Sequence, residues 1–483
     1  MVTISKSKYM HGLQCPKLLW CEINAPKLVP PVTEATQAIF DQGHEVGDLA
    51  KKQYPGGVEV SWEKGFKQTL ERTKELVAQR KTIFEASFAH KSAYCRADVL
   101  VPVAGGAWDI IEVKGATQVK DENIDDVAFQ RYCMEGTGLR IRRCHLMYIN
   151  NEFVRKGDID PAKFFTSEDI TDQVDKLMPL VEDNLAKMIA MLNGPMPKPA
   201  LGVECGDPKK CKVCSQDLAK LPENNVTELY YLGKRAYQLL SQGITLIKEL
   251  PKSFELTDKQ LIQQQCAATG KPNIDKKPIK KFLSGLQYPL YLLDFETAGL
   301  ALPLFDGTRP FQSVPFQLSL HIIDKHGAKP RHVEFLIDSP ADPRPRVVET
   351  LKAIGPAGTI LAYNMSFEKR VIADLADAFP KEKWLRGLIE RFEDPLILLR
   401  SFAYYHPEQH GSCSIKSVLP AWTGKSYEHL EISHGDEAAR IFVTKMYKEG
   451  GVDEKLRKAL LTYCAQDTEA IIDILKVLEK AVE

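Results

Sequence analysis

Residues 290–300 read LYLLDFETAGL, and this stretch decides how the second half of the chain is interpreted. The apolar run that ends at Leu293 is typical of a buried central strand. Because alternate residues of a strand share a face, Asp294 and Glu296 point to the same side. Two carboxylates that lie close together repel each other, and a bound cation or a shared proton offsets that repulsion. The stretch therefore predicts a buried strand that presents a pair of acids to a metal ion or a proton.

The chain has 483 residues, too many for one hydrophobic core, and this length predicts two or three domains. Its contents of hydrophobic residues (44%) and charged residues (27%) are those of a soluble globular protein. No apolar run is long enough to span a bilayer, and the N-terminus lacks the apolar core of a signal peptide. The 11 cysteines, an odd number scattered along the chain, do not suggest a disulfide framework. We therefore expect a cytoplasmic protein that does not enter a membrane.

The net charge of the chain gives no indication of a nucleic-acid partner, because 64 basic residues balance 64 acidic ones. Any binding of nucleic acid must depend on a local basic patch. Basic clusters occur at residues 140–145, 234–237 and 276–281, and each by itself is more typical of a solvated face.

The pattern of elements divides the chain into three parts and predicts an α/β fold. Residues 1–215 combine helical stretches with a strand hairpin, SAYCRADVLVPV and WDIIEVKG, joined by a glycine-containing turn. Residues 216–285 are interpreted as a mainly helical connector. From residue 286 to residue 483 strands alternate with helices, which predicts a second α/β domain with a mixed sheet.

The predicted hairpin carries a first set of charged side chains. Glu112 and Lys114 are two apart on one strand and share a face, and Asp98 on the neighbouring strand can meet them across the ladder. Carboxylate oxygens suit Mg²⁺ or Mn²⁺, and a lysine beside them can orient a water and stabilise charge on a scissile phosphate. The alternative is an exposed set of cross-strand ion pairs, which the E-x-K spacing alone favours.

This arrangement resembles the PD-(D/E)XK nuclease fold in its RecB-like branch: Asp98, then Glu112 and Lys114, then a helix that carries Gln130. The resemblance implies that the acids bind metal, that the lysine positions the nucleophile and that the glutamine helps to hold the site.

Two positions depart from that family's pattern. Met134 stands where the family usually has a tyrosine, and Gly47 stands where it often has a metal-binding histidine. His44 lies one turn earlier on the same helix face and is the candidate substitute ligand.

The segment ECGDPKKCKVCS contains Cys205, Cys211 and Cys214. Three cysteines need a fourth ligand for a tetrahedral sulfur site. The chain resembles RecB-like nucleases of the CRISPR-associated exonuclease kind, in which one cysteine precedes the nuclease core and three follow it. The resemblance implies that Cys15 and these three cysteines bind a [4Fe-4S] cluster. Zinc is the alternative metal, Cys21 competes for the first position, and unligated buried thiols are the remaining interpretation.

Residues 229–251, LYYLGKRAYQLLSQGITLIKELP, resemble the helix-hairpin-helix connectors of related nucleases. In those connectors a glycine turn presents backbone N–H groups to phosphate. Ordinary helix packing produces the same pattern and is the alternative.

Two later segments supply partners for the acids of the opening stretch. ILAYNMSFEKRV carries Asn364, Phe367 and Glu368 at the end of another predicted strand. LLTYCAQDTEAI carries Tyr463 and Asp467, which are four apart and therefore neighbours on one helix face. Four acids from three segments are what a two-metal phosphodiesterase site needs, with one ion activating water and the other stabilising the leaving oxygen. In such a site Tyr463 can orient the attacking water.

The order D-x-E, N-x-x-F-acid and Y-x-x-x-D over about residues 290–475 resembles the DnaQ-like DEDD exonucleases of the tyrosine subtype. The resemblance implies a ribonuclease-H-like fold in which Asp294, Glu296, Glu368 and Asp467 hold Mg²⁺ or Mn²⁺. That family ends its second motif in aspartate, and the longer glutamate here shifts the metal. A domain kept for binding or as a scaffold is the alternative. Asp394, in FEDPLILL, either supports this site or caps a helix.

The whole chain resembles an uncharacterised bacterial family that fuses these two nuclease domains. The resemblance implies an enzyme that hydrolyses phosphodiester bonds of single-stranded DNA, in DNA repair or in defence against foreign DNA. RNA is the alternative substrate. Three rival functions stay open. One domain cuts while the other only grips nucleic acid, or neither cuts and the protein is a binding module, or the enzyme acts on another phosphoester such as a nucleotide.

Overall fold

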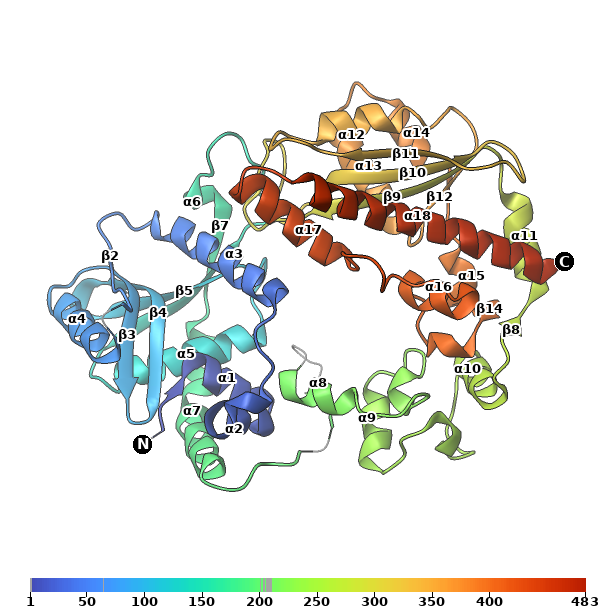
Figure 1. The fold of residues 1–483 in the computed structure, drawn as a ribbon. Coiled ribbons are helices and arrows are strands. Elements are labelled where there is room, and N and C mark those ends of the chain that lie inside the picture. The colour runs from blue at the N-terminus through green and yellow to red at the C-terminus, as the bar shows by residue number, and fades with distance from the viewer. Residues whose placement is uncertain (1, 64, 200, 203–204, 206–210) are drawn as a thin grey trace. The chain divides into compact units, whose positions relative to one another are not determined.

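The strands of the chain form two large sheets, each inside its own compact unit. A computed structural model describes residues 2–63, 65–199, 201–202, 205 and 211–483. One unit comprises Met1–Lys220 together with Leu300–Phe311, and the other comprises Leu221–Gly299 together with Gln312–Glu483. Each unit combines a mixed sheet with helices, so the predicted α/β class is confirmed (Figure 1).

The first unit is built on a seven-stranded sheet in the order β2-β3-β4-β5-β6-β7, with β1 paired to β4. β4 is antiparallel to both β3 and β5, whereas β5 and β6 run parallel. The predicted hairpin is confirmed as β4 and β5. The strands are β1 (Ile4–Ser5), β2 (Val58–Glu59), β3 (Ile83–His90), β4 (Ala93–Pro102), β5 (Trp108–Lys114), β6 (Ile141–Ile149) and β7 (Phe165–Asp169).

Helices cover both faces of this sheet. On one face α1, α5 and α7 share a core that includes Phe129. On the other face α3 contributes Val46 and Leu49 to a second core. The helices are α1 (Lys6–Gln14), α2 (Pro16–Asn24), α3 (Glu34–Lys51), α4 (Phe66–Ala78), α5 (Asp121–Glu135), α6 (Pro161–Phe164), α7 (Thr171–Leu192) and α8 (Lys212–Leu218).

The second unit is built on a five-stranded sheet in the order β11-β10-β9-β12-β13. The opening stretch of the sequence forms β9, the central strand, which is antiparallel to β10 and parallel to β12. The prediction of a buried central strand is confirmed. The strands are β9 (Leu290–Ala298), β10 (Val314–Ile323), β11 (Arg331–Leu336), β12 (Thr359–Leu361) and β13 (Phe392–Glu393).

Alternate residues of β9 face different helices, and this alternation places the two acids. Tyr291 and Phe295 pack in a core with α12, α13 and α14. Leu292 packs against α18, which crosses the other face of the sheet (Figure 1). By the same alternation Asp294 and Glu296 point toward α18. The helices are α12 (Arg344–Leu351), α13 (Ser366–Ala378), α14 (Trp384–Ile389), α15 (Leu396–Arg400), α16 (Ile415–Thr423), α17 (Gly435–Val443) and α18 (Glu454–Val482).

Length alone would allow α18, with 29 residues, to cross a membrane. Its charged side chains exclude that role, because a spanning helix needs an almost uninterrupted apolar stretch. In the described part of the chain no helix is both long enough and apolar enough to cross a membrane.

The predicted connector packs within the second unit and is mainly helical. Gly243, with φ of 79°, follows α9, and the chain next forms a 3₁₀ turn at Ile247–Glu249. The glycine turn therefore does not join two α-helices, as a helix-hairpin-helix would require. The connector contains α9 (Lys234–Ser241), α10 (Asp258–Thr269), α11 (Lys276–Gly285) and the short strand β8 (Asn273–Ile274), which pairs with β14 (Tyr404–Tyr405).

The segment Leu300–Phe311 lies between β9 and β10 in the sequence but packs within the first unit. The Arg155 backbone N–H donates to the Thr308 carbonyl (3.0 Å), and the Ala301 N–H donates to Gln42 Oε1 (3.1 Å). The side chain of Ala301 also joins the apolar core under α3. The first unit is thus completed by residues that follow the first strand of the second sheet.

Candidate functional site

The first candidate site lies on the β4–β5 hairpin. The register that pairs Val99 with Ile111 places Asp98 opposite Glu112. Glu112 is almost completely buried, and Asp98 Oδ2 accepts a hydrogen bond from the Val113 backbone N–H (2.7 Å). Because opposite residues of an antiparallel pair share a face, the two carboxylates lie on the same side of the hairpin.

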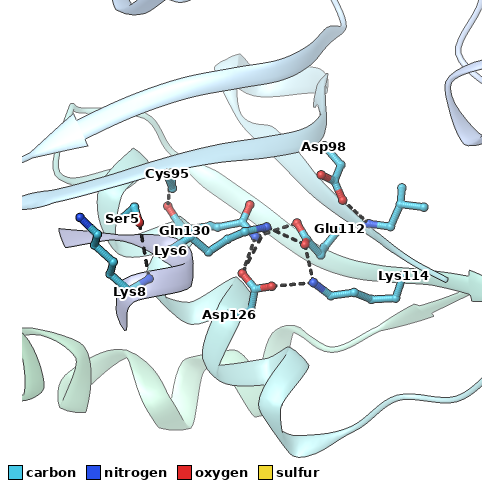
Figure 2. A network of polar contacts seen from close by, with 10 residues as sticks. Ser5, Lys6, Lys8, Cys95, Asp98, Glu112, Lys114, Asp126 and Gln130 are labelled. Atoms are coloured by element: carbon cyan, nitrogen blue, oxygen red, sulfur yellow. Dashed lines mark hydrogen bonds and ion pairs between the residues drawn. The ribbon is translucent and has the colours of Figure 1, made fainter. Parts of the chain in front are cut away.

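Two lysines neutralise the carboxylates around Glu112 (Figure 2). Lys114 Nζ lies 2.6 Å from Glu112 Oε1 and 2.6 Å from Asp126 Oδ2. Lys6, the first residue of α1, places its Nζ 2.8 Å from Glu112 Oε1 and 3.5 Å from Asp126 Oδ1. Gln130, on α5, donates through Nε2 to Glu112 Oε2 (2.7 Å) and Asp126 Oδ1 (2.9 Å). All four carboxylate oxygens of this acid pair therefore have partners.

Burial and the lysines act in opposite directions on these acids. Burial raises the pKa of Glu112, and the nearby carboxylates of Asp126 and Asp98 raise it further. Burial also raises the pKa of Asp98, although both lysines oppose this effect. At Asp126 burial is outweighed by Lys6 and Lys114, which hold its pKa well below its usual range. The cluster thus contains one firmly ionised acid and two acids whose ionisation is opposed by burial.

His44 does not join this cluster. It is exposed on α3, and in the described part of the chain it makes no hydrogen bond or ion pair. Met134, which stands where the related family has a tyrosine, is fully buried in the core. The structure therefore gives no support to a ligand role for this histidine.

The structure brings Asp98, Glu112, Lys114 and Gln130 together, but sequence reasoning missed two further members, Lys6 and Asp126. Asp126 lies four residues before Gln130 on the same helix, and that spacing could have identified it. No local pattern links Lys6 to Glu112, which is 106 residues away in the sequence.

The second candidate site is a group of buried cysteines in the first unit. The Sγ atoms of Cys15, Cys211 and Cys214 lie within 4.8 Å of one another, and those of Cys15 and Cys214 are 3.7 Å apart. Cys205 and Cys21 belong to the same buried cluster, and the Cys205 thiol contributes to raising the pKa of Cys214. None of these cysteines forms a disulfide.

This cysteine cluster has the chemistry of a sulfur-ligated metal centre. A hydrogen bond from Cys15 lowers the pKa of the Cys211 thiol, against the effect of burial, which favours a thiolate at this position. Thiolates are the ligands of zinc and of iron–sulfur clusters. Three sulfurs in mutual contact and a fourth beside them fit a four-ligand site, although sulfur ligands alone do not distinguish zinc from iron.

The third candidate site lies where β9 meets α18. Oxygens of Asp294, Glu296 and Asp467 lie within 4.8 Å of one another. The side chain of Cys464, also on α18, donates to Asp294 Oδ2 (3.4 Å). The D-x-E pair of the opening stretch and the acid of the Y-x-x-x-D segment thus share one site.

Glu368, the fourth expected acid, lies in the first turn of α13. It is 3% exposed, and its Oε2 has no hydrogen-bond partner in the described part of the chain. Its charge raises the pKa of Asp294. Its oxygens are not in the group formed by Asp294, Glu296 and Asp467, whose oxygens lie within 4.8 Å of one another. A buried carboxylate oxygen without a partner requires a cation or a proton.

Burial raises the pKa of all four acids in this third site. The pKa rises to about 8 for Glu296, where Asp467 adds to the effect of burial, and to about 8 for Glu368. It rises to about 6 for Asp467, although a hydrogen bond from Tyr427 opposes burial there, and well above its usual range for Asp294. The site therefore resists its full negative charge unless positive charge is added.

Two tyrosines and a lysine surround these acids. Tyr427 donates to Asp467 Oδ1 (2.6 Å), and buried Tyr463 also lowers the pKa of that carboxyl. Lys416 Nζ lies 5.3 Å from the centre of the Tyr463 ring and 5.5 Å from that of Tyr427. Sequence reasoning found Tyr463 from its spacing, but it missed Tyr427 and Lys416, which no local pattern connects to the acids.

Asp394 accepts hydrogen bonds from the backbone of two segments. Its Oδ1 accepts from the Leu396 N–H (2.8 Å) at the start of α15, and its Oδ2 accepts from the Met365 N–H (3.1 Å) just before α13. Asn364, the preceding residue, has a left-handed backbone with φ of 70°. Asp394 therefore links the start of α15 to the residue that precedes α13, the helix that carries Glu368.

Parts of the chain are similar to known proteins. Residues 291–414 match a family described as a domain of unknown function, DUF2779, which includes Asp294, Glu296 and Glu368 but ends before α18. The chain is also similar to an uncharacterized protein, MG366 homolog, of Mycoplasma pneumoniae, with 26% identity over 204 residues. That alignment covers 38% of this chain and 31% of the relative, so the match spans about a third of the relative's length.

Proposed function

We propose that this protein is a metal-dependent nuclease that hydrolyses phosphodiester bonds of single-stranded DNA. The observation that carries the proposal is the acid group at β9 and α18. Asp294, Glu296 and Asp467 offer oxygens within 4.8 Å of one another, and Glu368 adds a buried oxygen without a described partner. Oxygen ligands of this kind fit hard divalent ions such as Mg²⁺ or Mn²⁺.

Divalent ions supply charge that activates water and stabilises a leaving oxygen when they are bound to such a site. The chain's own residues hold the acids and prepare the approach of the substrate. Tyr427 fixes the Asp467 carboxylate by a hydrogen bond, and Tyr463 lies beside it to orient the attacking water. Lys416, above both tyrosine rings, adds positive charge that attracts phosphate.

We propose that the hairpin site of the first unit is a second nuclease site. Asp98 and Glu112 are its metal-binding acids, with Gln130 holding Glu112 and Lys114 available to position a water. Lys6 and Lys114 occupy Glu112 Oε1 in this structure, so metal binding requires the ammonium groups to move away from that oxygen.

The alternative is that one unit cuts and the other only grips nucleic acid. Two observations favour it: Glu368 lies outside the group of three acids, and the hairpin carboxylates are already paired with lysines. We also propose that the protein acts in DNA repair or in defence, and that its substrate is DNA and not RNA.

The test uses single-stranded DNA and RNA of one sequence, labelled at either end, with Mn²⁺. The wild type is compared with Lys114→Ala and Asp294→Ala. If each substitution removes a different set of products, both sites cut, and the labels give the polarity of each. If Asp294→Ala leaves every product unchanged while Lys114→Ala abolishes cleavage, the second unit is a binding platform. No cleavage by the wild type on either substrate contradicts the proposal.

Matched control variants distinguish the loss of catalysis from a general disturbance of the fold. Lys81→Ala changes an exposed lysine of the first unit, and Asp338→Ala changes an exposed acid of the second. Both control variants should cleave like the wild type.

We further propose that Cys15, Cys205, Cys211 and Cys214 bind a [4Fe-4S] cluster, with zinc as the alternative. Protein purified without oxygen should be brown and should contain iron and acid-labile sulfide in equal amounts. Cys211→Ser should lose both, whereas Cys144→Ser, which changes a buried cysteine outside the cluster, should retain them. Colourless protein that contains zinc would show that the cysteines bind zinc instead.

A further inference from the structure

The second unit contains an open cavity of about 510 Å³ that is lined by none of the four acids. The cavity brings together segments that are far apart in the sequence: Tyr230 and Tyr231 of the connector, Tyr363 and Asn364 after β12, and parts of residues 396–415. Its volume falls within the range of about 300–1,000 Å³ that is typical of small-molecule sites. It is therefore large enough for a ligand of nucleotide size.

Tyr231 lines this cavity in an unfavourable conformation. The residue is 84% exposed, and its backbone has a left-handed φ of 50°. Its described ring contact is with Tyr230, edge-on, with ring centres 4.6 Å apart. An exposed aromatic ring and a left-handed backbone at a bulky residue are both unfavourable. A flat ligand stacked on the free face of the ring would offset this cost.

The one charged residue among the described residues that line the cavity is the basic Arg400. Burial raises the pKa of Asp394, and the charge of Arg400 lowers it. Within the described residues Arg400 forms no hydrogen bond or ion pair. Lys259 Nζ lies 5.5 Å from the centre of the Tyr230 ring. None of the described lining residues is acidic, and the neighbouring Glu228 carboxylate is engaged by His410 Nδ1 (3.1 Å). The cavity therefore suits a ligand that combines a flat ring with an anionic group.

Two segments of the chain connect this cavity to the acid site. Asn364 lines the cavity, and Glu368 follows four residues later in the first turn of α13. Ile415 also lines it, and the next residue, Lys416, lies over the ring of Tyr463. Two stretches of backbone that line the cavity therefore also carry residues that lie at or beside the acid site, whose other acids come from β9 and α18.

We propose that this cavity is a nucleotide subsite, in which an unpaired base stacks on Tyr231 while Arg400 contacts a backbone phosphate. The proposal rests on the proposed nuclease function and deepens it, because a base within a duplex is stacked and unavailable to the ring. According to this proposal the second unit binds single-stranded nucleic acid, and the connector contacts the substrate directly.

The test measures binding without cleavage. Fluorescein-labelled oligothymidylate, oligouridylate and a duplex of equal length are titrated by anisotropy into the full chain in EDTA. Tyr231→Ala should weaken binding of both single strands about tenfold and leave the weak duplex binding unchanged. Arg400→Met should lower the slope of log affinity against log salt by about 0.7, the value for one lost phosphate contact on a single strand.

The controls are an exposed tyrosine and an exposed arginine of the same unit. Tyr288→Ala and Arg346→Met should bind all three probes like the wild type. Any contribution of the first unit is common to every variant, so differences among the variants report on the second unit. Unchanged single-strand binding by both Tyr231→Ala and Arg400→Met, or an equal loss on the duplex, would overturn the proposal.

This design separates the subsite from the nuclease proposal. If the wild type never cleaves but Tyr231→Ala still weakens single-strand binding, the subsite stands and the nuclease function fails. If the wild type cleaves normally and neither variant alters binding, the subsite fails and the nuclease function stands.

Discussion

The two acid clusters of this protein balance their negative charge in different ways. In the hairpin cluster, Glu112 and Asp126 are paired with Lys6 and Lys114 at distances of 2.6–3.5 Å. The cluster at β9 and α18 has four acids, and its nearby ammonium group, on Lys416, lies over tyrosine rings. One cluster therefore has lysines in direct contact with its carboxylates. In the other, burial raises the pKa of Glu296 and Asp467 although the charge of Lys416 lowers it.

This difference determines what each cluster does without metal. A buried ion pair loses stability when one partner is removed, because the other charge is left without compensation. A group of buried like charges gains stability when one of them is removed, because repulsion and desolvation both fall. The same chemical change should therefore have opposite effects on the two units.

The largest expected effect comes from Glu112→Gln compared with Glu296→Gln in EDTA at neutral pH. Glu112→Gln should lower the free energy of unfolding of the first unit by about 3 kcal/mol, because two lysines lose a charged partner. Glu296→Gln should raise that of the second unit by about 2 kcal/mol, because its raised pKa reports the cost of ionising there. Hydrogen exchange of peptides from β5 and β9 across a urea series measures each unit separately.

Glu393→Gln, which changes an exposed glutamate on β13, provides the control and should alter neither unit. If Glu112→Gln and Glu296→Gln both destabilise their units, the proposed contrast between the clusters is wrong.

Added Mn²⁺ sharpens the contrast. At a concentration of 100 times the dissociation constant, a ligand that binds only the folded state stabilises it by about 2.7 kcal/mol. The second unit should approach this gain at lower Mn²⁺ than the first unit, in which an ion must displace Lys6 and Lys114 from Glu112. Asp294→Asn should remove most of the gain in the second unit. Calorimetric melting in a Mn²⁺ series tests this order, and stabilisation of the first unit at lower Mn²⁺ than the second contradicts it.

The stability of the metal-free second unit should fall as the pH rises. Glu296 and Glu368 have pKa values of about 8 when folded, and unfolded glutamates have pKa values of about 4.3. The folded unit therefore binds more protons between these values, and the free energy of unfolding decreases across this window, by about 2 kcal/mol or more. Urea unfolding in EDTA at pH 5, 6.5 and 8 measures the trend. Excess Mn²⁺ should reverse it, because the metal binds ionised acids, and a rise in metal-free stability with pH would refute the assignment.

The smallest expected effect concerns Lys6. Lys6→Met removes one of the two cations on Glu112 and should raise the affinity of the first unit for Mn²⁺ about fivefold, or roughly 1 kcal/mol. Calorimetric titration in an Asp294→Asn background isolates the first unit. A fall in affinity would mean that this lysine helps to hold the acids in a metal-binding arrangement.

Patterns within one element predicted much of the β9–α18 site. Strand alternation placed Asp294 and Glu296 on one face, and the four-residue spacing on a helix linked Tyr463 to Asp467. These relations depend only on the local geometry of a strand or a helix, so the sequence suffices to find them. The α/β class followed in the same way from alternating strand and helix patterns.

The sequence patterns did not predict the residues that reach a site from an element distant in the sequence. Tyr427 lies 40 residues before Asp467, and Lys6 lies 106 residues before Glu112. Both contacts depend on how elements pack after folding, which no periodicity encodes. Local geometry also misled in one case: the turn at Gly243 matches a helix-hairpin-helix pattern, but the residues after it form a 3₁₀ turn.

The path of the segment Leu300–Phe311 has a consequence for how the chain is made. Ala301 belongs to the core of the first unit, yet it follows β9 in the sequence. During synthesis, domains generally fold from the N-terminus as they emerge from the ribosome. Here the first unit is not complete until residue 311 has emerged, and by then β9 has been made without its neighbours β10 and β12. A truncated chain that stops at residue 220 therefore lacks part of its own interior, and expression of the two halves as separate proteins should begin from a different division of the sequence.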